Sequence, residues 1–365
     1  WIPYDRFYNI KYIAKGGFGK VYKANWIDGF IVYWDNKSRN WKRNGSNKYV
    51  ALKSLNNSKN ITSEFINEIT SHHKILGNHV SIIRLYGITQ DPVTKNYMMI
   101  LRYAVNGSLR NYLDKNYNKL KWKTKFYDLW NIASGLYHIH ENNLIHRDLH
   151  VGNILRADLY TCITDIGLCK PADYNALENT KKRVYGVLPY IAPEILRGQN
   201  YTKAADIYSF GIIIYEVISG LPPYHDVSHD INLAMKICQG LRPKFSFKVP
   251  QLIVHLIKSC LDANPLNRPS ASEVRNILLQ WFNELNNRKK MIETEIKKQI
   301  REAGNINKKL QTRNSIPSTS LSYETHSEAI YISRLLDFNN LPEPKNSYDY
   351  YKQYDNIIST EYSGK

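Results

Sequence analysis

The stretch Ile145-His146-Arg147-Asp148-Leu149-His150-Val151-Gly152-Asn153-Ile154-Leu155 carries the strongest signal in the sequence. It packs a histidine, an arginine, an aspartate and an asparagine between apolar anchors, and burying so many polar groups is costly unless they serve a purpose. Asp148 supplies a carboxylate that can accept a proton from a hydroxyl. Asn153 supplies an oxygen that can bind a divalent metal. The stretch therefore predicts a catalytic loop.

Further motifs follow toward the C-terminus. Twelve residues after Asn153, Thr164-Asp165-Ile166-Gly167 offers the carboxylate of Asp165, a hard oxygen ligand suited to Mg²⁺. Beyond it lie three more polar motifs in apolar surroundings: Ala192-Pro193-Glu194, Asp206-Ile207-Tyr208-Ser209-Phe210-Gly211 and Asn267-Arg268-Pro269. Each alone could arise by chance, so their order and spacing carry the argument.

Two motifs precede the catalytic loop. In Ala14-Lys15-Gly16-Gly17-Phe18-Gly19-Lys20-Val21, glycines between two predicted strands allow backbone amides to close over phosphates. In Val50-Ala51-Leu52-Lys53, a lysine leaves an apolar strand, and Glu68 on a predicted helix fifteen residues later can pair with it. Taken singly, both signals are weak, because glycine-rich turns and lysines at strand edges are common.

The hydrophobic pattern predicts an α+β chain of two unequal parts, with strands gathered early and helices late. The predicted strands fall in residues 10–35, 49–52, 82–87 and 97–103, with a polar loop at 36–48. A helix is predicted from Ser63. The later helices are predicted at 124–141, 206–219, 229–239, 251–261 and 270–285.

All these motifs, in this order, resemble the eukaryotic protein kinase family over roughly residues 10–283, and the stretch from Asp206 to Gly211 resembles its tyrosine-kinase-like branch. The resemblance implies a two-lobed α+β fold. Its small lobe, about 10–104, would be an antiparallel sheet with one helix, and its larger lobe, about 105–283, mostly helical. Residues 1–9 would be a flank. Residues 284–365 would form a tail, first an amphipathic helix from Arg288 to Ala303 and then largely disordered.

The resemblance also implies ATP and Mg²⁺ in the cleft, and γ-phosphoryl transfer to a protein hydroxyl, serine or threonine rather than tyrosine, in intracellular signalling. Asp148 would take the hydroxyl proton, and Lys53, paired with Glu68, would hold the α- and β-phosphates. Asn153 and Asp165 would bind the metal. The nucleotide would also contact Ala14, Gly16 and Gly19 over the phosphates, Val21, Ala51 and Leu155 around adenine, and Leu101, Arg102 and Ala104 at the hinge.

The resemblance assigns three residues to the scaffold and shows three departures from the family pattern. Glu194 and Arg268 would form an ion pair, and Asp206 would brace the catalytic loop. His150 stands in place of a lysine, Val187 in place of a threonine and Ala14 in place of a glycine. An imidazolium at His150 would make the transfer rate fall as pH rises through about 6.5. The alternative function is a catalytically weak pseudokinase that acts as a nucleotide-binding scaffold.

The charge distribution bears on partners. The net charge is +18, but residues 284–365 hold 13 basic and 11 acidic residues, so the excess lies before the tail. Seven basic residues and no acidic one fall between Asn36 and Ser63, where the 36–48 insert, with Trp26, Trp34 and Trp41 close by, could dock an acidic partner. A solvated basic loop is at least as good an explanation. No nucleic-acid module is recognisable, so we expect no nucleic-acid partner.

The remaining features bear on location. No apolar run is long enough to span a membrane. The four cysteines form no C-x-x-C pair, which fits a reducing compartment, and we expect a cytoplasmic protein. The first residue is Trp1 rather than methionine, so we expect a piece of a longer reading frame or a processed product.

Residues 165–194 would be an activation loop whose Tyr174, Thr180 or Tyr185 could be phosphorylated, Thr180 being the first choice.

Overall fold

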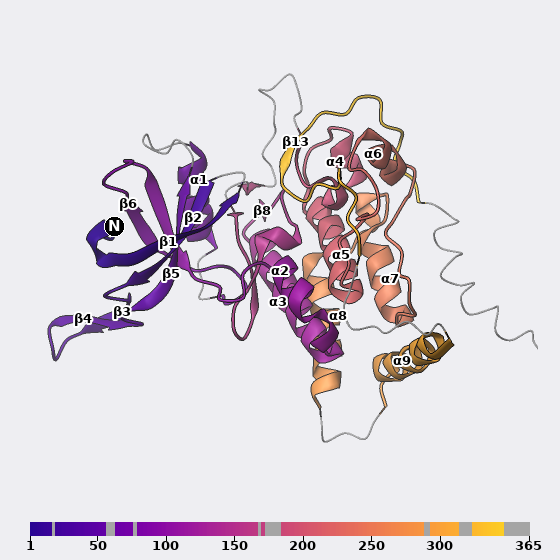
Figure 1. Cartoon of the computed structure of the whole chain (residues 1–365), viewed down its shortest axis with the longest axis horizontal. Helices are drawn as coiled ribbons and strands as arrows, with labels where there is room; N and C mark the ends of the chain where they lie inside the picture. The colour runs from indigo at the N-terminus through magenta and orange to yellow at the C-terminus, as the bar shows by residue number, and fades with distance from the viewer. Residues whose placement is uncertain are drawn as a thin grey trace, which may run out of the picture.

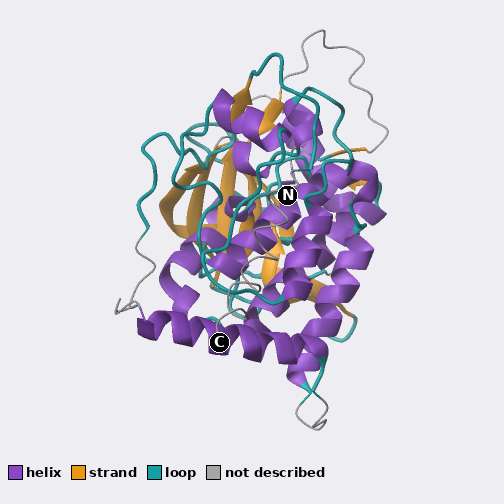
Figure 2. Cartoon of the chain, turned by 90° about the vertical axis from the view of Figure 1, so that its right-hand side faces the viewer, coloured by secondary structure: helices purple, strands orange, loops and turns teal. Residues whose placement is uncertain are grey.

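A sheet lobe and a helical lobe make up the protein, joined after strand β7 (Tyr97–Arg102) (Figure 1). The structure, a computed structural model, describes residues 1–16, 19–55, 63–75, 79–166, 169–171, 184–287, 293–313 and 323–346. The predicted two-lobed α+β architecture is confirmed. Seen from the helical side, the helices lie in front of the sheet (Figure 2).

The small lobe is built on an antiparallel sheet with the strand order β1-β2-β5-β7-β6. Residues alternate between its faces: Met98 and Ile100 enter one apolar cluster, and Met99 and Leu101 enter the other. Helix α1 (Ser63–Lys74) belongs to the same lobe. The remaining strands of the sheet are β1 (Phe7–Gly16), β2 (Gly19–Trp26), β5 (Lys48–Leu55) and β6 (Leu85–Gln90).

The large lobe packs around two buried helices. Helix α3 (Trp122–Glu141) carries the predicted apolar stripe, with Phe126, Leu129 and Ile132 fully buried. Helix α5 (Lys203–Ser219) is buried along nearly its whole length and ends at Gly220, whose positive φ closes the helix. The other helices are α2 (Leu109–Asn116), α4 (Pro193–Leu196), α6 (Ile231–Cys238), α7 (Gln251–Cys260) and α8 (Ala271–Asn286).

Short pieces of secondary structure complete the large lobe. Strands β9 (Ile154–Arg156) and β10 (Thr161–Ile163) pair after the catalytic loop, and β8 (Leu144–Ile145) pairs with β11 (Lys170–Pro171). Strand β12 (Val184–Gly186) pairs with β13 (Arg334–Leu336), which lies far away in the sequence. Among the described residues, 3-10 turns occur in the large lobe at Tyr117–Lys119, Val151–Asn153, Leu188–Tyr190 and Pro265–Asn267, and in the small lobe at Tyr4–Arg6.

Two segments differ from the sequence-based expectation at the small lobe. The 36–48 insert is not wholly a loop, because β3 (Phe30–Asp35) and β4 (Asn40–Asn44) form an antiparallel hairpin. Trp34 and Trp41 face each other across it, their ring centroids 5.0 Å apart, and this contact stabilises a hairpin that polar residues alone do not predict. The 1–9 flank also contributes to the lobe, since Phe7 is buried in its core.

The C-terminal tail, residues 284–365, differs more from the sequence-based expectation. Helix α9 spans Glu295–Arg313, ten residues beyond the predicted end at Ala303. The prediction that the rest is largely disordered does not hold for residues 323–346, which run along the large lobe past α4 and α6 (Figure 1). Leu336 and Leu341 enter the main apolar core, which supplies the burial that holds this segment in place.

Two further properties concern only the described residues. None of the helices placed there is long and apolar enough to cross a bilayer. All four cysteines, Cys162, Cys169, Cys238 and Cys260, are buried free thiols.

Candidate active site

The catalytic loop, residues 146–153, is held in position by the fold beneath it. The carboxylate of Asp206, in the first turn of α5, accepts hydrogen bonds from the backbone N–H of His146 at 2.8 Å and of Arg147 at 3.0 Å. It also contacts His140 Nε2 at 2.9 Å. Asp206 thus braces the loop, as the resemblance implies. Arg147 has a φ of +71°, an uncommon conformation that these anchors maintain.

Asp148 lies at the centre of the loop, with its carboxylate buried. Asn153 Nδ2 donates to its backbone oxygen at 2.9 Å and to its Oδ2 at 3.2 Å. Burial would raise the pKa of Asp148, but interactions with His150 and a hydrogen bond from Ser333 outweigh burial and lower it. The carboxylate therefore stays ionised near neutral pH and can accept a proton.

Lys53, Glu68 and Asp165 form one cluster across the two lobes. Lys53 Nζ on β5 lies 2.8 Å from Glu68 Oε1 on α1 and is also paired with Asp165 Oδ1, which follows β10. Burial alone would lower the pKa of Lys53, but the carboxylates of Asp165 and Glu68 raise it, so the ammonium remains charged. The predicted pairing of Lys53 with Glu68 is therefore present, and Asp165 joins it.

The oxygens that could hold a metal are suited to Mg²⁺. Asn153 donates to Asp148 through its amide nitrogen, so its side-chain oxygen can serve as a ligand. Asp165 has a φ of +59°, which turns it out of the regular backbone, and its side chain is partly exposed. In the part of the chain that the structure describes, no three His, Cys, Asp or Glu side chains cluster as a metal site. Two protein ligands fit Mg²⁺, which commonly completes its shell with waters and phosphates.

Several of the residues predicted to contact the nucleotide lie at one face of the sheet. Val21 on β2 is paired with Lys53. Ala51 and Leu155 pack against the apolar cluster that contains Leu101. The remaining predicted contacts lie at the edges of this surface: Gly16 pairs with Gly19, Ala14 pairs with Val21, and Arg102 and Ala104 lie where the chain leaves β7.

One hydrogen bond limits how the hinge residue Arg102 can contact the adenine. The N–H of Arg102 donates to the carbonyl of Arg84 at 2.9 Å, so the backbone of Arg102 has only its carbonyl to offer an adenine.

Some residues of the predicted site lie outside the described residues. They are Gly17 and Phe18 of the glycine-rich turn, Gly167 of the Asp165 motif, and the phosphorylation candidates Tyr174 and Thr180. Tyr185 is described: it lies in β12, and its backbone oxygen accepts a hydrogen bond from the hydroxyl of Tyr201.

The ring of His150 is oriented by a backbone group. Its Nδ1 accepts a hydrogen bond from the N–H of Gly152 at 3.1 Å, and a backbone N–H can only donate. The ring proton therefore lies on Nε2 in this geometry. An imidazolium in place of the missing lysine would also carry a proton on Nδ1 and would lose this hydrogen bond. Val187 is buried beside the loop and, being apolar, makes no hydrogen bond to it through its side chain.

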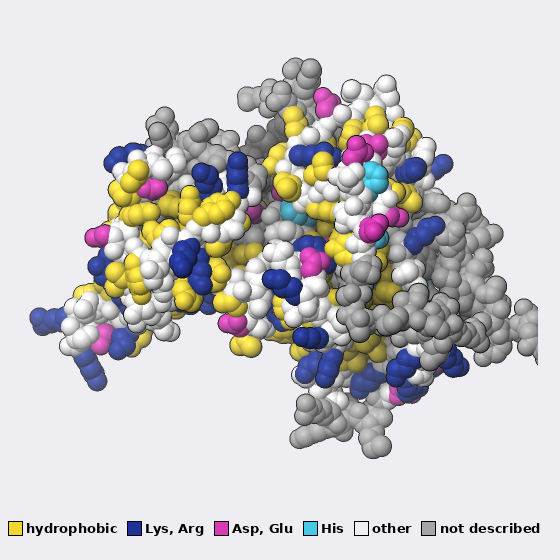
Figure 3. All heavy atoms as spheres, viewed as in Figure 1, with side chains coloured by type: hydrophobic (Ala, Val, Ile, Leu, Met, Phe, Trp, Pro, Cys, Tyr) yellow, Lys and Arg dark blue, Asp and Glu magenta, His cyan; other side chains and the backbone are white. Residues whose placement is uncertain are grey.

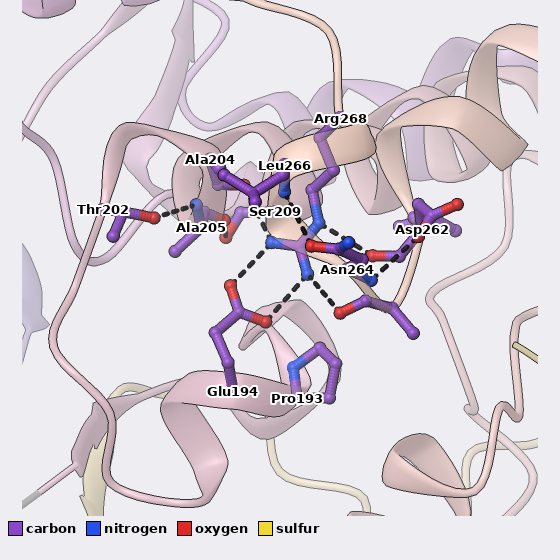
Figure 4. A network of polar contacts seen from close by, with 12 residues as sticks. Pro193, Glu194, Thr202, Ala204, Ala205, Ser209, Asp262, Asn264, Leu266 and Arg268 are labelled. Carbon is purple, nitrogen blue, oxygen red and sulfur yellow. Dashed lines mark hydrogen bonds and ion pairs between the residues drawn. The ribbon is translucent and has the colours of Figure 1, made fainter. Parts of the chain in front are cut away.

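The predicted scaffold pair is also present (Figure 4). Arg268 Nη1 and Nη2 donate to the two carboxylate oxygens of Glu194 at 2.7 and 2.8 Å. The remaining donors of the guanidinium reach backbone oxygens of Asp262, Ala204 and Ala263. A buried ion pair of this kind needs all its donors satisfied, and here they are.

Sequence-based reasoning missed one residue that lies in the site. Ser333, from the tail, places its hydroxyl against the carboxylate of Asp148. An available signal was the apolar run Ala329-Ile330-Tyr331-Ile332 followed by Leu335-Leu336 within an otherwise polar tail. A short apolar run of this kind predicts burial, although it does not say against what.

Comparison with known families gives one match that covers most of the chain. The family described as protein tyrosine and serine/threonine kinase matches residues 8–278. This range contains every predicted site residue and excludes the tail.

Individual relatives agree with the family match. The chain is 28% identical over 283 residues to a probable serine/threonine-protein kinase of Dictyostelium discoideum, covering 74% of this chain and 19% of the relative. It is 30% identical to the probable serine/threonine-protein kinase roco5 of the same organism, covering 74% and 9%. It is 29% identical to the tyrosine-protein kinase SPK-1 of Girardia tigrina, covering 71% and 50%. The chain thus spans half or less of these relatives.

Proposed function

Because the chain belongs to the protein tyrosine and serine/threonine kinase family, we propose that it is an active kinase that transfers the γ-phosphoryl group of ATP to a protein serine or threonine. The observation that carries this proposal is the meeting of Lys53, Glu68 and Asp165 in one ion cluster. The buried, ionised Asp148 with its hydrogen-bonded Asn153 complements that cluster.

Each residue has a physical role in the proposed reaction. Lys53, held by Glu68, would neutralise charge on the α- and β-phosphates. Asn153 and Asp165 would hold Mg²⁺, which when bound shields the phosphate oxygens as negative charge develops. Asp148 would orient the acceptor hydroxyl and take its proton. The protein would thus act mainly by positioning and by preorganised electrostatics.

The preference for serine or threonine rests on two observations. The stretch from Asp206 to Gly211 resembles the tyrosine-kinase-like branch and its serine/threonine members. Two of the relatives described above are named as serine/threonine kinases, whereas one is named as a tyrosine kinase. An assay on a mixed peptide library with ATP and Mg²⁺ tests activity and acceptor preference together.

The Asp148→Asn variant is the critical comparison in that assay. Loss of a general base costs about 10²–10⁴ in rate. Asp158→Asn is a matched control, because Asp158 is exposed on the β9–β10 turn, and it should leave the rate unchanged. Equal incorporation in wild type and Asp148→Asn would contradict the proposal. If neither transfers phosphate but both bind ATP, the alternative of a nucleotide-binding pseudokinase, which His150 and Val187 favour, is supported.

We also propose that the β3–β4 hairpin docks an acidic partner. Lys37, Arg39, Lys42 and Arg43 are exposed on it, and Lys and Arg side chains project from the tip of the hairpin at the lower left of Figure 3. Binding of an acidic peptide should weaken with salt, because exposed charges are screened beyond about 10 Å at 0.1 M. Binding that persists in Lys42→Glu/Arg43→Glu would contradict this role.

A further inference from the structure

The tail segment 323–346 is bound to the large lobe at many points. Two of its hydrogen bonds are made with His229, a buried residue of the large lobe. The backbone N–H of His229 donates to Glu328 O at 3.1 Å, and the N–H of Ile330 donates to His229 Nδ1 at 3.1 Å. The hydroxyl of Tyr331 donates to Pro223 O at 2.9 Å. Farther along, Arg197 donates to Glu343 Oε2 at 2.5 Å and to the carbonyl of Leu341. The segment is therefore docked along its length.

At the active site the tail adds a strand. In the antiparallel pairing of β13 with β12, Arg334 lies opposite Gly186 and Leu336 opposite Val184. Gly186 lies close to the catalytic aspartate, because a Cβ built there would be 3.3 Å from Asp148 Oδ1. Strand addition of this kind is a common mode of peptide binding. It brings Ser333, the residue before β13, next to the catalytic loop.

The hydroxyl of Ser333 lies where an acceptor hydroxyl must lie. Its Oγ is 2.8 Å from Asp148 Oδ2 and 3.0 Å from Oδ1, within the range required for proton transfer to a general base. It is also 3.2 Å from His150 Nε2. Because the ring proton of His150 is on Nε2, the imidazole donates to Oγ, and Oγ–H donates to Asp148. This pair of hydrogen bonds fixes the orientation of the hydroxyl.

We propose that Ser333 is a phosphorylation site of this chain, modified by its own active site within the same molecule. The inference rests on the proposed kinase function and names its first substrate. In the transfer, the Oγ–H bond breaks and the proton passes to Asp148. A lone pair of Oγ forms the bond to the γ-phosphorus of ATP. The bond from that phosphorus to the bridging oxygen breaks, and its electron pair leaves with ADP.

The same geometry defines the class of external substrate. With the backbone paired to β12, a serine side chain just reaches Asp148, whereas a tyrosine hydroxyl lies a whole ring farther from its Cα and would overshoot. Leu336, three residues after the acceptor, is buried in the main core. Tyr331, two residues before it, stacks edge-on against His229 with centroids 4.8 Å apart. Peptides of the pattern Tyr-x-Ser-x-x-Leu should therefore be good substrates of a chain whose own tail is displaced, as in Leu336→Asp.

The test begins with phosphatase-treated full chain, incubated with ATP and Mg²⁺ and followed by mass spectrometry at Ser333. An intramolecular reaction is first order, so its half-time should stay constant on serial dilution. Ser327 is the internal control, because it lies in the same tail, six residues before Ser333, and is exposed. Its phosphorylation should be slower than that of Ser333. Ser333→Thr should keep the modification, and Asp148→Asn should lose it.

A matched pair of substitutions tests the docking itself. Leu336 is buried, whereas its neighbour Leu335 is 52% exposed. Burial of a leucine contributes about 1.5–3 kcal/mol, so Leu336→Asp should slow modification of Ser333 by about 10–100-fold. Leu335→Asp should have little effect. Without nucleotide, amide hydrogen exchange at residues 184–186 and 334–336 should accelerate in Leu336→Asp only, a readout that needs no catalysis.

Four results would overturn the inference. Half-times that lengthen on dilution would show transfer between molecules, and modification of Ser327 in step with Ser333 would show that docking does not select the acceptor. A chain that phosphorylates the peptide library but never Ser333 would overturn the tail inference alone. A chain that phosphorylates neither would overturn the kinase proposal and this inference with it.

Discussion

Two buried ion clusters connect distant parts of this chain, and they differ in construction. Arg268 and Glu194 lie within the large lobe, and the guanidinium also reaches three backbone oxygens. Lys53 instead joins the lobes: its partner Glu68 lies on α1 of the small lobe, and Asp165 follows β10 of the large lobe. The first cluster is closed on itself, whereas the second includes a partly exposed carboxylate.

The difference teaches how to separate stability from function. A closed, fully satisfied pair stabilises one packing arrangement, and breaking it exposes an uncompensated buried charge. An open cluster between lobes keeps charge available to a ligand. We therefore expect loss of Arg268 to affect folding and loss of Asp165 to affect the reaction.

The largest effect is expected for Arg268→Met. It leaves Glu194, which is 3% exposed, without its cation, and removal of one partner of a buried pair costs about 3–5 kcal/mol. For a domain of this size the melting temperature should fall by roughly 10 °C. Calorimetry measures this change. The transfer rate per folded molecule, assayed well below the melting temperature, should match wild type, and a selective loss of rate would break the comparison.

The next effect is expected for Asp165→Asn. Removal of one preorganised electrostatic group costs about 10²–10³ in rate. Stability should change by less than about 1 kcal/mol, because the side chain of Asp165 is 28% exposed and Lys53 retains Glu68. Steady-state kinetics and thermal melts on one preparation check both values. A variant that unfolds rather than losing rate would show that the open cluster is structural after all.

A pH experiment addresses the surroundings of Lys53. Burial, aided by the charge of Lys53, lowers the pKa of His72 to about 4, and its Nε2 is buried with no hydrogen-bond partner among the described residues. The unfolded chain, with a histidine pKa of about 6.5, then binds more protons between these values, so stability falls on acidification from pH 6.5 to 4. A shift of this size corresponds to about 3 kcal/mol.

The variant His72→Phe should remove that part of the pH dependence. Melting temperatures of wild type and variant should converge on acidification or cross in favour of the variant, since wild type alone loses stability through His72. A difference between the two that is constant with pH would mean that His72 does not titrate in this way.

The smallest effect is expected for Ser270→Ala. Ser270 caps helix α8: its hydroxyl accepts from the N–H of Glu273, whose carboxylate accepts from the N–H of Ser270. Loss of such a cap costs about 1 kcal/mol. This variant, two residues from Arg268 in the sequence, is a reference for a substitution that lowers stability and leaves the transfer rate unchanged. Chemical denaturation should show the decrease, and an unchanged rate is required if the assay is to separate the two properties.

The sequence predicted the fold and the cleft because their signals are local. Lys53 and Glu68 are fifteen residues apart, and each lies on an element with clear periodicity. Asp148, Asn153 and Asp165 fall within eighteen positions, in two polar motifs that each lie in apolar surroundings. Their contacts are present, while their roles in transfer stay predictions.

What the sequence could not provide depends on contacts between distant segments. The register of Arg334 opposite Gly186 is set by tertiary burial of Leu336, and a three-residue strand has no periodicity to detect. The β3–β4 hairpin depends on the contact between Trp34 and Trp41, and the polar composition of residues 36–48 does not predict that contact. The state of His150 depends on one backbone N–H, from Gly152, that no sequence pattern shows.

Strand β13 belongs to the same chain as strand β12, with which it pairs, and this changes how other peptides bind to β12. A tethered segment is present at its binding site at an effective concentration of about a millimolar. A free peptide that pairs with β12 competes with the tail, so the apparent affinity of the peptide is weakened in proportion to the effective concentration of the tail. Screens on the intact chain will therefore miss moderate binders that a Leu336→Asp chain would reveal. If Ser333 is phosphorylated as we propose, repulsion between its phosphate and Asp148 should displace the tail, and strand β12 becomes available to other peptides.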